Sequence, residues 1–593
     1  MVKSINNNLT QILKITDQCL LYLSLGCSVA ILFNLGYNTN LEAILLVDHF
    51  LRYTFFLIGI LHIARLVLIL FFVKKRKLIQ YGEIFLSLYF LFIMLSNVFG
   101  LSAGHLHFLQ AEWIYFGVFA TLLIAVSKVS LFFDDFYFNP TILFVISFLM
   151  LILIGTLLLV LPNSTTDGNL SFVNALFTAT SAVCVTGLTV FDVSVKFTQF
   201  GQTVILVLIQ LGGLGIMTFT GFFGYFFTGG FSYKNQLMYT ELLSEDKIGS
   251  VMKTLSKIVF ITLLFEAIGA LFIFFNLPSN VFSSYGERVY FSVFHAISAF
   301  CNAGFSTIQD GLYNPLLRFN YNIHLIIAVL IIFGGLGFNI MANTYAYFKR
   351  RITGLYRKIR YNEPVKFLAQ ELTFTSRIIL YTTAFLLTGA TILFFILEYN
   401  NILQEHKTLW GKIVTSFFLS ATPRSAGFST VNIQGLASPS ILLLFFLMWV
   451  GASPGSNGGG IKTTTFAISF LNIFSIARGK ENLELFKRRI TKDTSIRALA
   501  VIILSFIIIG TVLFLLSITD SEKGFRALAF ESLSAFAISG LSLGITPELS
   551  ESGKIILVFA MFIGRIGALT LLIAFVKNTK IKAYRYPSDT VQL

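Results

Sequence analysis

Four short stretches of the chain share one pattern of small residues around a glycine. Each has Ser-Ala, a glycine a few residues later, then Leu or Phe, then Ser or Thr. The glycines are Gly187, Gly304, Gly427 and Gly540, spaced by 113 to 123 residues, and the third stretch is one residue longer than the others. Glycine has no Cβ, so its backbone adopts positive φ without strain and can turn successive carbonyls the same way. Such carbonyl oxygens can replace the hydration shell of a permeating cation.

Each glycine stretch lies between two apolar segments. The preceding segments, at residues 142–161, 258–275, 378–397 and 499–516, are long enough to cross about 30 Å of hydrocarbon as helices. The residues just before each glycine, such as 172–182, form too short a segment to span and are predicted to re-enter the membrane as a short helix. The predicted unit is therefore helix, pore helix, filter loop, helix.

A second glycine element follows each stretch within an apolar run. These elements are Gly212 to Gly215, Gly334 to Gly337, the segment from Gly451 onward, and Gly564 to Gly567. Glycines also let membrane helices pack closely, and for the first two clusters that alternative stays open. Close packing does not require the flanking Ser-Ala and Leu/Phe-Ser/Thr, so it explains the four filter glycines poorly.

The four loops are predicted to meet around one axis. Irregular backbone at membrane depth is tolerated only where it is buried in protein or lines a watery cavity. The short helices would aim their negative C-terminal ends at that axis, which favours cations. The candidate cation-binding residues of glycine loops 1 to 4 are, in order, Val185, Thr186, Gly187, Leu188; Asn302, Ala303, Gly304, Phe305; Ser425, Ala426, Gly427, Phe428; and Ile538, Ser539, Gly540, Leu541.

The composition places these elements in a bilayer. The chain is 56% hydrophobic and 12% charged, with a mean hydropathy of +0.81. Its net charge of +15 gathers in linkers between apolar segments, as in the cytoplasmic loops of membrane proteins, and not in a tail that would bind nucleic acid. We predict an all-α polytopic protein of the cell (inner) membrane with about twelve spans and both termini in the cytoplasm.

The predicted domains follow the repeat. Residues 1–138 form an N-terminal extension with up to four transmembrane helices, and four pore repeats occupy 139–240, 241–365, 366–492 and 493–593. The extension is interpreted as a packing or dimer-facing appendage. Arg65 alone does not make a voltage sensor, which needs several arginines on one helix.

The third repeat carries the segment GASPGSNGGGIKTTT at residues 451–465. Its glycines and proline cannot sustain a helix, so the second helix of this repeat is predicted to break there. A phosphate-binding loop does not fit, because Ile461 separates Gly460 from Lys462 and no strand precedes the segment.

Several charged residues fall within or beside apolar runs. Arg565 is expected to face the bundle interior or a water-filled cavity, with pairing to Glu531 or snorkelling as the alternatives. Glu266 is interpreted as a structural helix contact. Three carboxylates that follow filters could concentrate cations at the outer mouth or could be solvated surface charges: Asp192, Asp310 and Glu548.

Taken together, these motifs resemble the Trk/Ktr/HKT superfamily of cation transporters over about residues 139–580. The resemblance implies a KtrB/TrkH-like membrane pore subunit, similar to a fused potassium-channel tetramer, that takes up K⁺ through filter backbone. Glycine at position 187 would go with potassium preference. The broken helix would be an intramembrane gate, in which Arg565 acts as an electrostatic barrier, and the gate residues would be Gly455, Gly458, Gly459, Gly460, Lys462 and Arg565.

The resemblance also implies partners. It predicts a homodimer in membrane lipid, controlled by a cytoplasmic nucleotide-binding regulatory ring of the TrkA/KtrA type. K⁺ would be the transported ion, and we expect no organic cofactor in this chain. An enzyme is not expected, because no paired nucleophile and base and no metal motif is evident. The remaining alternative is a Na⁺- or H⁺-coupled cation symporter, although such folds commonly show two inverted halves.

Overall fold

The computed structural model describes residues 2–37, 41–72, 79–98, 111–129, 140–215, 251–278, 284–361, 372–480 and 482–567, together with residues 282 and 572. Within these ranges nearly all regular structure is helical. The strands there form one small hairpin of β1 (Glu484–Leu485) and β2 (Arg488–Arg489). The predicted all-α class is therefore confirmed.

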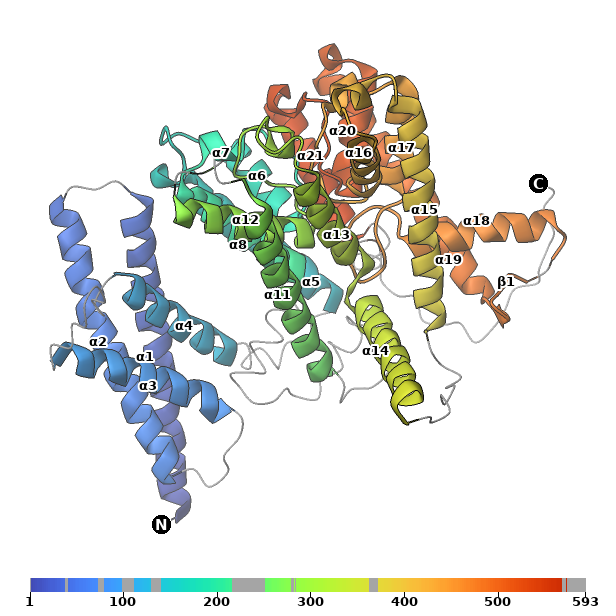
Figure 1. Cartoon of the computed structure of the whole chain (residues 1–593). Coiled ribbons are helices and arrows are strands. Elements are labelled where there is room, and N and C mark those ends of the chain that lie inside the picture. Colours follow the sequence, from blue (N-terminus) through green and yellow to red (C-terminus); the bar gives the residue numbers. More distant parts are fainter. Residues whose placement is uncertain are drawn as a thin grey trace, which may run out of the picture.

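Four N-terminal helices form a bundle with its own buried core. They are α1 (Val2–Gly36), α2 (Leu41–Phe72), α3 (Ile79–Val98) and α4 (Ala111–Val129). Arg65 on α2 contacts Asp17 on α1, with Nε 3.1 Å from Oδ1. The bundle stands to one side of the other helices in Figure 1, and Asn163 beyond α5 donates to the carbonyl of Leu35 at 3.0 Å. Arg65 thus joins two helices of the bundle, as a packing role requires.

The remaining helices fall into four groups. The first group holds α5 (Pro140–Val160), α6 (Phe172–Cys184), α7 (Val193–Lys196) and α8 (Gln199–Leu214), and the second holds α11 (Val251–Asn276), α12 (Tyr285–Cys301), α13 (Tyr321–Leu336) and α14 (Phe338–Tyr361). The third holds α15 (Phe374–Glu398), α16 (Leu409–Ala421), α17 (Ser438–Trp449) and α18 (Thr463–Ala477), and the fourth holds α19 (Lys492–Thr519), α20 (Phe525–Ala537) and α21 (Glu551–Ile566). Each group begins with a long apolar helix followed by a short one.

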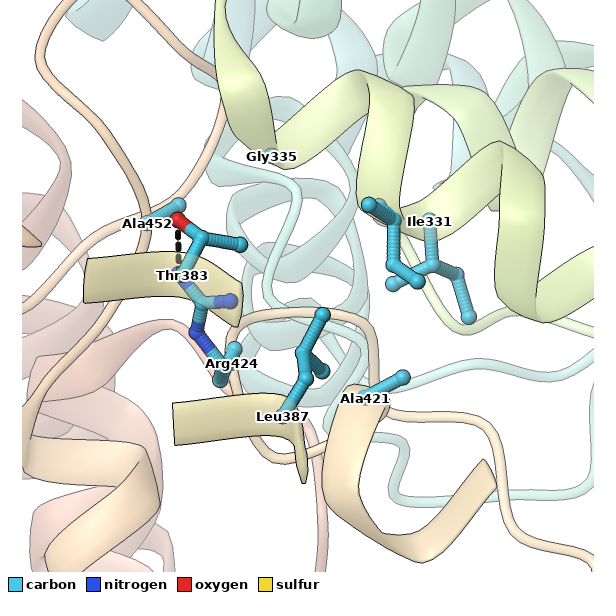
Figure 2. A pocket seen from close by; sticks show the side chains of 8 residues that line it. Ile331, Gly335, Thr383, Leu387, Ala421, Arg424 and Ala452 are labelled. Atoms are coloured by element: carbon cyan, nitrogen blue, oxygen red, sulfur yellow. Dashed lines mark hydrogen bonds between the residues drawn. The ribbon is translucent and has the colours of Figure 1, made fainter. Parts of the chain in front are cut away.

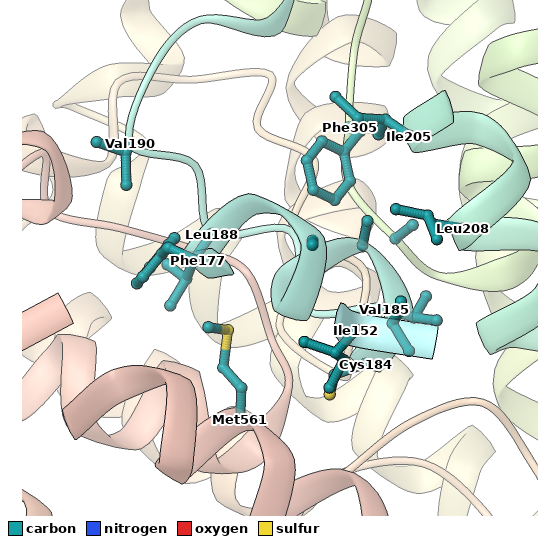
Figure 3. Packing of buried hydrophobic residues seen from close by; sticks show 14 of the residues in the cluster. Ile152, Phe177, Cys184, Val185, Leu188, Val190, Ile205, Leu208, Phe305 and Met561 are labelled. Atoms are coloured by element: carbon teal, nitrogen blue, oxygen red, sulfur yellow. The ribbon is translucent and has the colours of Figure 1, made fainter. Parts of the chain in front are cut away.

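Contacts between the groups run in a closed cycle. In each group the long first helix packs on its own short helix, α5 on α6 being the first case. The helix after each glycine loop packs on the short helix of the next group: α8 on α12, α13 on α16, α17 on α20, and α21 on α6. Lys554 of α21 donates to Asn174 Oδ1 of α6 at 3.1 Å, which joins the last group to the first. Figure 3 shows the buried core at this junction, where Met561 of α21 faces Phe177 and Leu188.

The lengths of the described helices limit how many cross a membrane. Five are long and apolar enough to do so, or six if α13 and α14, bent by 106°, count as one span. The helices after the glycine loops are short because they end at a second glycine element, as α8 does before Gly215. The predicted total of about twelve spans stays a prediction, as does the placement of the termini.

The predicted repeat boundaries also stay predictions. Those at residues 138/139, 240/241 and 365/366 lie outside the described residues, and the fourth, at 492/493, coincides with the start of α19.

Candidate functional site

The four predicted filter glycines meet around one point, and all four have positive φ. A Cβ atom built on each would approach the carbonyl oxygen that precedes the next glycine of the cycle. The distances are 2.5 Å from Gly187 to Ala303, 2.6 Å from Gly304 to Ala426, 3.1 Å from Gly427 to Ser539, and 2.2 Å from Gly540 to Thr186. The structure thus brings glycine loops 1 to 4 together in the order of the chain, with loop 4 against loop 1, and a side chain at any of the four glycines would require the neighbouring backbone to shift.

The Ser-Ala motif explains how the short helices turn into these loops. α6, α12 and α20 each end three residues before the glycine, and the next residue adopts the left-handed conformation: Val185, Asn302 and Ile538. The N–H just before the glycine then donates to the carbonyl of the motif serine, for example from Thr186 to Ser181 at 2.7 Å. Left-handed backbone at a residue with a side chain costs about 1–3 kcal/mol. The serine contacts help to hold that conformation.

The serine side chains add further contacts. Ser181 Oγ accepts from the Gly187 N–H at 3.1 Å, and Ser298 Oγ donates to the Phe305 carbonyl at 2.9 Å. These bonds fix the backbone on both sides of a glycine. They give the serine of the repeated pattern a role that helix packing alone would not require.

Loop 3 departs from the expected alignment, which put Ser420 in the role of motif serine. Pro423 has no N–H and cannot continue a helix, and α16 already ends at Ala421. Thr422 now holds the loop, since its Oγ1 donates to the Phe428 carbonyl at 2.5 Å and its carbonyl accepts from the Ala426 N–H at 3.0 Å. Ser420 instead donates to the Phe417 carbonyl of its own helix, and its Oγ lies 3.0 Å from Thr391 Oγ1 of α15. In loop 3, Thr422 therefore takes the place that the motif serine has in the other three loops.

The exchange of roles in loop 3 can be measured. Thr422→Val would leave the buried Phe428 carbonyl without that donor, which is expected to lower the free energy of unfolding by about 1–3 kcal/mol. Ser420→Ala is expected to cost about 1 kcal/mol, because it loses a bond within its own helix and the contact with Thr391 Oγ1, which keeps its own bond to the Leu387 carbonyl. Thermal unfolding of the two purified variants would compare them, and a larger loss for Ser420→Ala would refute the assignment.

The second glycine elements serve two purposes. A Cβ on Gly212, Gly334 or Gly564 would lie 2.1, 2.0 or 2.1 Å from a carbonyl oxygen at the end of a short helix, so these glycines allow close packing. In addition, α8, α13 and α21 each end at a glycine of positive φ: Gly215, Gly337 and Gly567. The packing alternative therefore holds for Gly212 and Gly334, and the last glycine of each cluster ends a helix.

The predicted helix break in the third group is confirmed. α17 ends at Trp449 and α18 begins at Thr463, and we call residues 450–462 between them the interhelix loop. Ile461 donates to the Trp449 carbonyl at 3.1 Å, which closes the loop at its base. The loop also reaches other groups, because the Ser453 N–H donates to Gly335 at 3.0 Å and the Gly459 N–H to Ser425 Oγ at 3.3 Å. It therefore lies directly against glycine loop 3.

Arg565 lies beside the interhelix loop and is partly buried. Its guanidinium donates to the carbonyl of Asn457 in the loop and to the carbonyl of Gly212 on α8. The alternative pairing with Glu531 is wrong, because the Glu531 carboxylate accepts from Ser542 Oγ and from Thr546 Oγ1 instead. A second cation belongs to the loop itself, since Lys462 Nζ donates to the Gly458 carbonyl. Arg565 thus ties the loop to the first group.

One buried cation near the glycine loops escaped the sequence interpretation. Arg424, in the longer loop 3, is 7% exposed and donates to Thr383 Oγ1 at 3.5 Å. Figure 2 shows both side chains at a cavity of about 10 Å³ beside Gly335 and Ala452. A cation just beyond the C-terminal end of α16 is favoured by the helix dipole. The extra residue of this stretch, next to an arginine in an apolar region, was the available signal.

The carboxylates after the loops differ in their surroundings. Asp192 and Asp310 are exposed neighbours, with the Asp310 N–H donating to Asp192 Oδ2 at 3.2 Å. Glu548 accepts from Lys523 Nζ at 2.6 Å, and this hydrogen bond holds the pKa of Glu548 below its ordinary value. Glu548 is therefore partly neutralised, whereas the two aspartates form an acidic pair between loops 1 and 2.

Glu266 joins three helices. Its carboxylate accepts from Gln210 Nε2 of α8 at 3.0 Å and from Cys301 Sγ of α12 at 3.7 Å. These contacts agree with its interpretation as a structural helix contact.

Comparison with known proteins identifies the family. The model of the TrkH family, described as cation transport protein, matches residues 107–584. The chain is 36% identical to Ktr system potassium uptake protein B of Vibrio alginolyticus, over 75% of this chain and 93% of that protein. It is 37% identical to the protein of the same name from Bacillus subtilis, over 77% of this chain and 96% of that one.

Two further comparisons agree. The chain is 34% identical to potassium/sodium uptake protein NtpJ of Enterococcus hirae, over 77% of this chain and 97% of that protein. The crystal structure of the potassium transporter TrkH from Vibrio parahaemolyticus superposes with a TM-score of 0.57 at 16% identity, covering 84% of this chain and 98% of that one, so it supports the fold. With its helices, its ring of glycine loops and these relatives, the chain belongs to the TrkH family of membrane cation transport proteins, within the Trk/Ktr group.

Proposed function

We propose that this protein takes up potassium ions across the cell membrane, through a selectivity filter built from glycine loops 1 to 4. The observation that carries the proposal is the closed ring in which each glycine abuts the carbonyl before the next one. Backbone carbonyls gathered at one point are suited to replace the water around a K⁺ ion. The names of the relatives, three of which include potassium uptake or potassium/sodium uptake, support the choice of ion.

The interhelix loop is proposed to be the gate, with Gly455, Gly458, Gly459, Gly460, Lys462 and Arg565 as its main residues. Its contact with Ser425 of glycine loop 3 supports this assignment. Arg565 donates to Asn457 of this loop and contributes a positive charge there. A cation crossing a low-dielectric region is repelled by such a charge, so movement of the loop and Arg565 would control flow.

The setting of this pore is also a proposal. The basic side chains of α14 and of the β1–β2 hairpin, among them Lys349, Arg350 and Arg488, would face the cytoplasm with both termini. The protein would work as a homodimer in membrane lipid, under control of a cytoplasmic ring of nucleotide-binding subunits. Helices α1 to α3 of the N-terminal bundle precede the region of the family model and α4 lies within it, and the bundle would be a packing or dimer-facing appendage.

Flux of radioactive rubidium into liposomes tests the proposal. The purified chain, with its regulatory subunit supplied, is expected to carry rubidium down its own gradient. Absence of flux would refute the channel-like mechanism. Saturable flux that strictly requires a Na⁺ or H⁺ gradient would favour the coupled symporter, which the name of the Enterococcus relative keeps as the second candidate.

Selectivity is expected to depend on Gly187. A serine Cβ here would meet the Ala303 carbonyl at 2.5 Å, so loops 1 and 2 must separate and the filter must widen. Gly187→Ser is expected to raise sodium permeation relative to rubidium by about tenfold. This ratio corresponds to a change of roughly 1.4 kcal/mol in the difference between the free-energy barriers for the two ions. Competition between the two ions in the liposome assay gives the ratio, and an unchanged ratio would count against a filter role for this glycine.

A further inference from the structure

Two of the four short helices reach forward to hold the serine that follows their own glycine loop. In α12, His295 Nε2 lies 2.8 Å from Ser306 Oγ. In α20, the Glu531 carboxylate accepts from Ser542 Oγ. Both helix residues lie nine positions before their glycine and both serines two positions after it. The same contact is thus made twice with different chemistry.

The hydrogen-bond directions follow from the partners. His295 Nδ1 lies 2.9 Å from the Phe291 carbonyl, which can only accept, so Nδ1 carries the proton and Nε2 accepts from Ser306. Glu531 accepts from Ser542 on one oxygen and from Thr546 Oγ1, at 3.0 Å, on the other. Both His295 and Glu531 are 0% exposed. Each serine is therefore bonded to a buried acceptor on a rigid helix.

The other two short helices make no such bond. Thr178, at the same position in α6, donates to the Asn174 carbonyl of its own helix at 2.9 Å. α16 carries Phe417 and Phe418 there, and Ser429 after loop 3 donates to Val431 at 2.5 Å. Loops 2 and 4 stand opposite each other in the ring, because the glycines follow one another in chain order. The bracing thus alternates around the ring.

We propose that His295 and Glu531 are positioning residues that fix the outer ends of glycine loops 2 and 4 and so set the selectivity of the filter. This inference rests on the proposed function of the loops. A buried hydrogen bond from Ser306 or Ser542 to a helix limits how far the carbonyls just before that serine can turn. Loops 1 and 3 lack the brace, so the geometry of two opposite loops determines how well a smaller ion is coordinated.

Paired substitutions separate the bond from the bulk of the side chain. Glu531→Leu removes the acceptors at similar size, whereas Glu531→Gln keeps hydrogen-bonding groups in the same shape. His295→Phe keeps the ring stacked on Phe291, at 3.8 Å between centroids, and His295→Gln restores an acceptor. Thr178→Val is the matched control, because it loses only a bond within its own helix.

The readout is the ratio of sodium to rubidium permeation in liposomes, measured with the KM and maximal rate of rubidium flux. Glu531→Leu and His295→Phe are expected to raise the ratio by about fivefold to tenfold, with each Gln variant within about twofold of wild type. Thr178→Val should leave the ratio unchanged. A loss of maximal rate with an unchanged ratio in the Leu and Phe variants would overturn the proposal.

Misfolding of a variant is covered by a second set of substitutions, and loss of wild-type flux is interpreted separately. If a Leu or Phe variant does not fold, Ser306→Ala and Ser542→Ala remove the same bonds from the other end with a small change of volume. They also remove the contact of Ser306 with the Ile308 N–H and those of Ser542 with the Gly544 N–H and Thr546 Oγ1. These serine variants are expected to raise the ratio as well, and unchanged ratios would overturn the proposal. Flux through wild type together with unchanged ratios refutes only this inference, whereas absence of wild-type flux refutes the proposed function itself.

Discussion

Replacing Gly540 with alanine is expected to reduce rubidium flux by at least about tenfold to a hundredfold. Gly540 has φ +78, and left-handed backbone with a side chain costs about 1–3 kcal/mol. Its new methyl group would lie 2.2 Å from the Thr186 carbonyl and 3.0 Å from the Cα of Gly427. These atoms belong to the backbone, so they cannot move aside as the end of a flexible side chain can. The methyl group would therefore distort the ring where loop 4 meets loops 1 and 3.

A matched control exists in the same group of helices. Gly510 lies in the interior of α19, and a Cβ there would meet nothing within 4 Å. Gly510→Ala is expected to keep wild-type flux and to gain up to about 1 kcal/mol of helix stability. The liposome assay compares the two variants at equal protein content. Near-wild-type flux through Gly540→Ala would show that loop 4 does not line the ion path.

Substituting Arg565 is expected to have the second largest effect, in the opposite direction. Arg565→Gln removes a positive charge beside the interhelix loop and leaves one shorter amide group, whose NH2 can donate to a carbonyl. A unit charge a few Å from a passing cation costs several kcal/mol at intermediate dielectric, so basal rubidium flux should rise by about tenfold or more. The measurement is flux without the regulatory subunit, where the closed gate limits the wild type.

The control for Arg565 is another arginine of the same group. Arg526, on α20, is exposed. Arg526→Gln removes one positive charge at a position outside the interhelix loop, so it should leave basal flux unchanged. A fall in flux through Arg565→Gln would mean that this arginine stabilises the pore and does not obstruct it. Equal flux through wild type and Arg565→Gln would rule out an electrostatic barrier role for Arg565.

The features that repeat or that break a helix could be predicted from sequence. The four glycine loops share a pattern with a regular spacing, and the break at residues 450–462 follows from glycines and a proline in an apolar run. The four long first helices follow from apolar segments of sufficient length. Each of these predictions rests on neighbouring residues, whose effect on the backbone is local.

Contacts between distant segments could not be predicted in this way. Arg565 finds carbonyl partners 108 and 353 positions away, and a carbonyl carries no signature in a sequence. Thr422, and not Ser420, holds loop 3 because Pro423 allows no further helix. This change of backbone geometry is not visible when the four stretches are aligned by residue type. The bonds of His295 and Glu531 likewise appear only when the loops are folded back on their helices.

The closing contact between α21 and α6 also bears on how the protein is made. Lys554 and Asn174 are 380 residues apart, and ribosomes add about 5–20 residues per second. The first short helix therefore waits roughly 20 to 80 s after synthesis before its partner leaves the ribosome. Throughout that interval α6 is without its final neighbour. A nascent chain truncated before α21 would hold all four glycine loops but would lack the helix that closes the cycle, so it should be a substrate for membrane quality control and not a leaky channel.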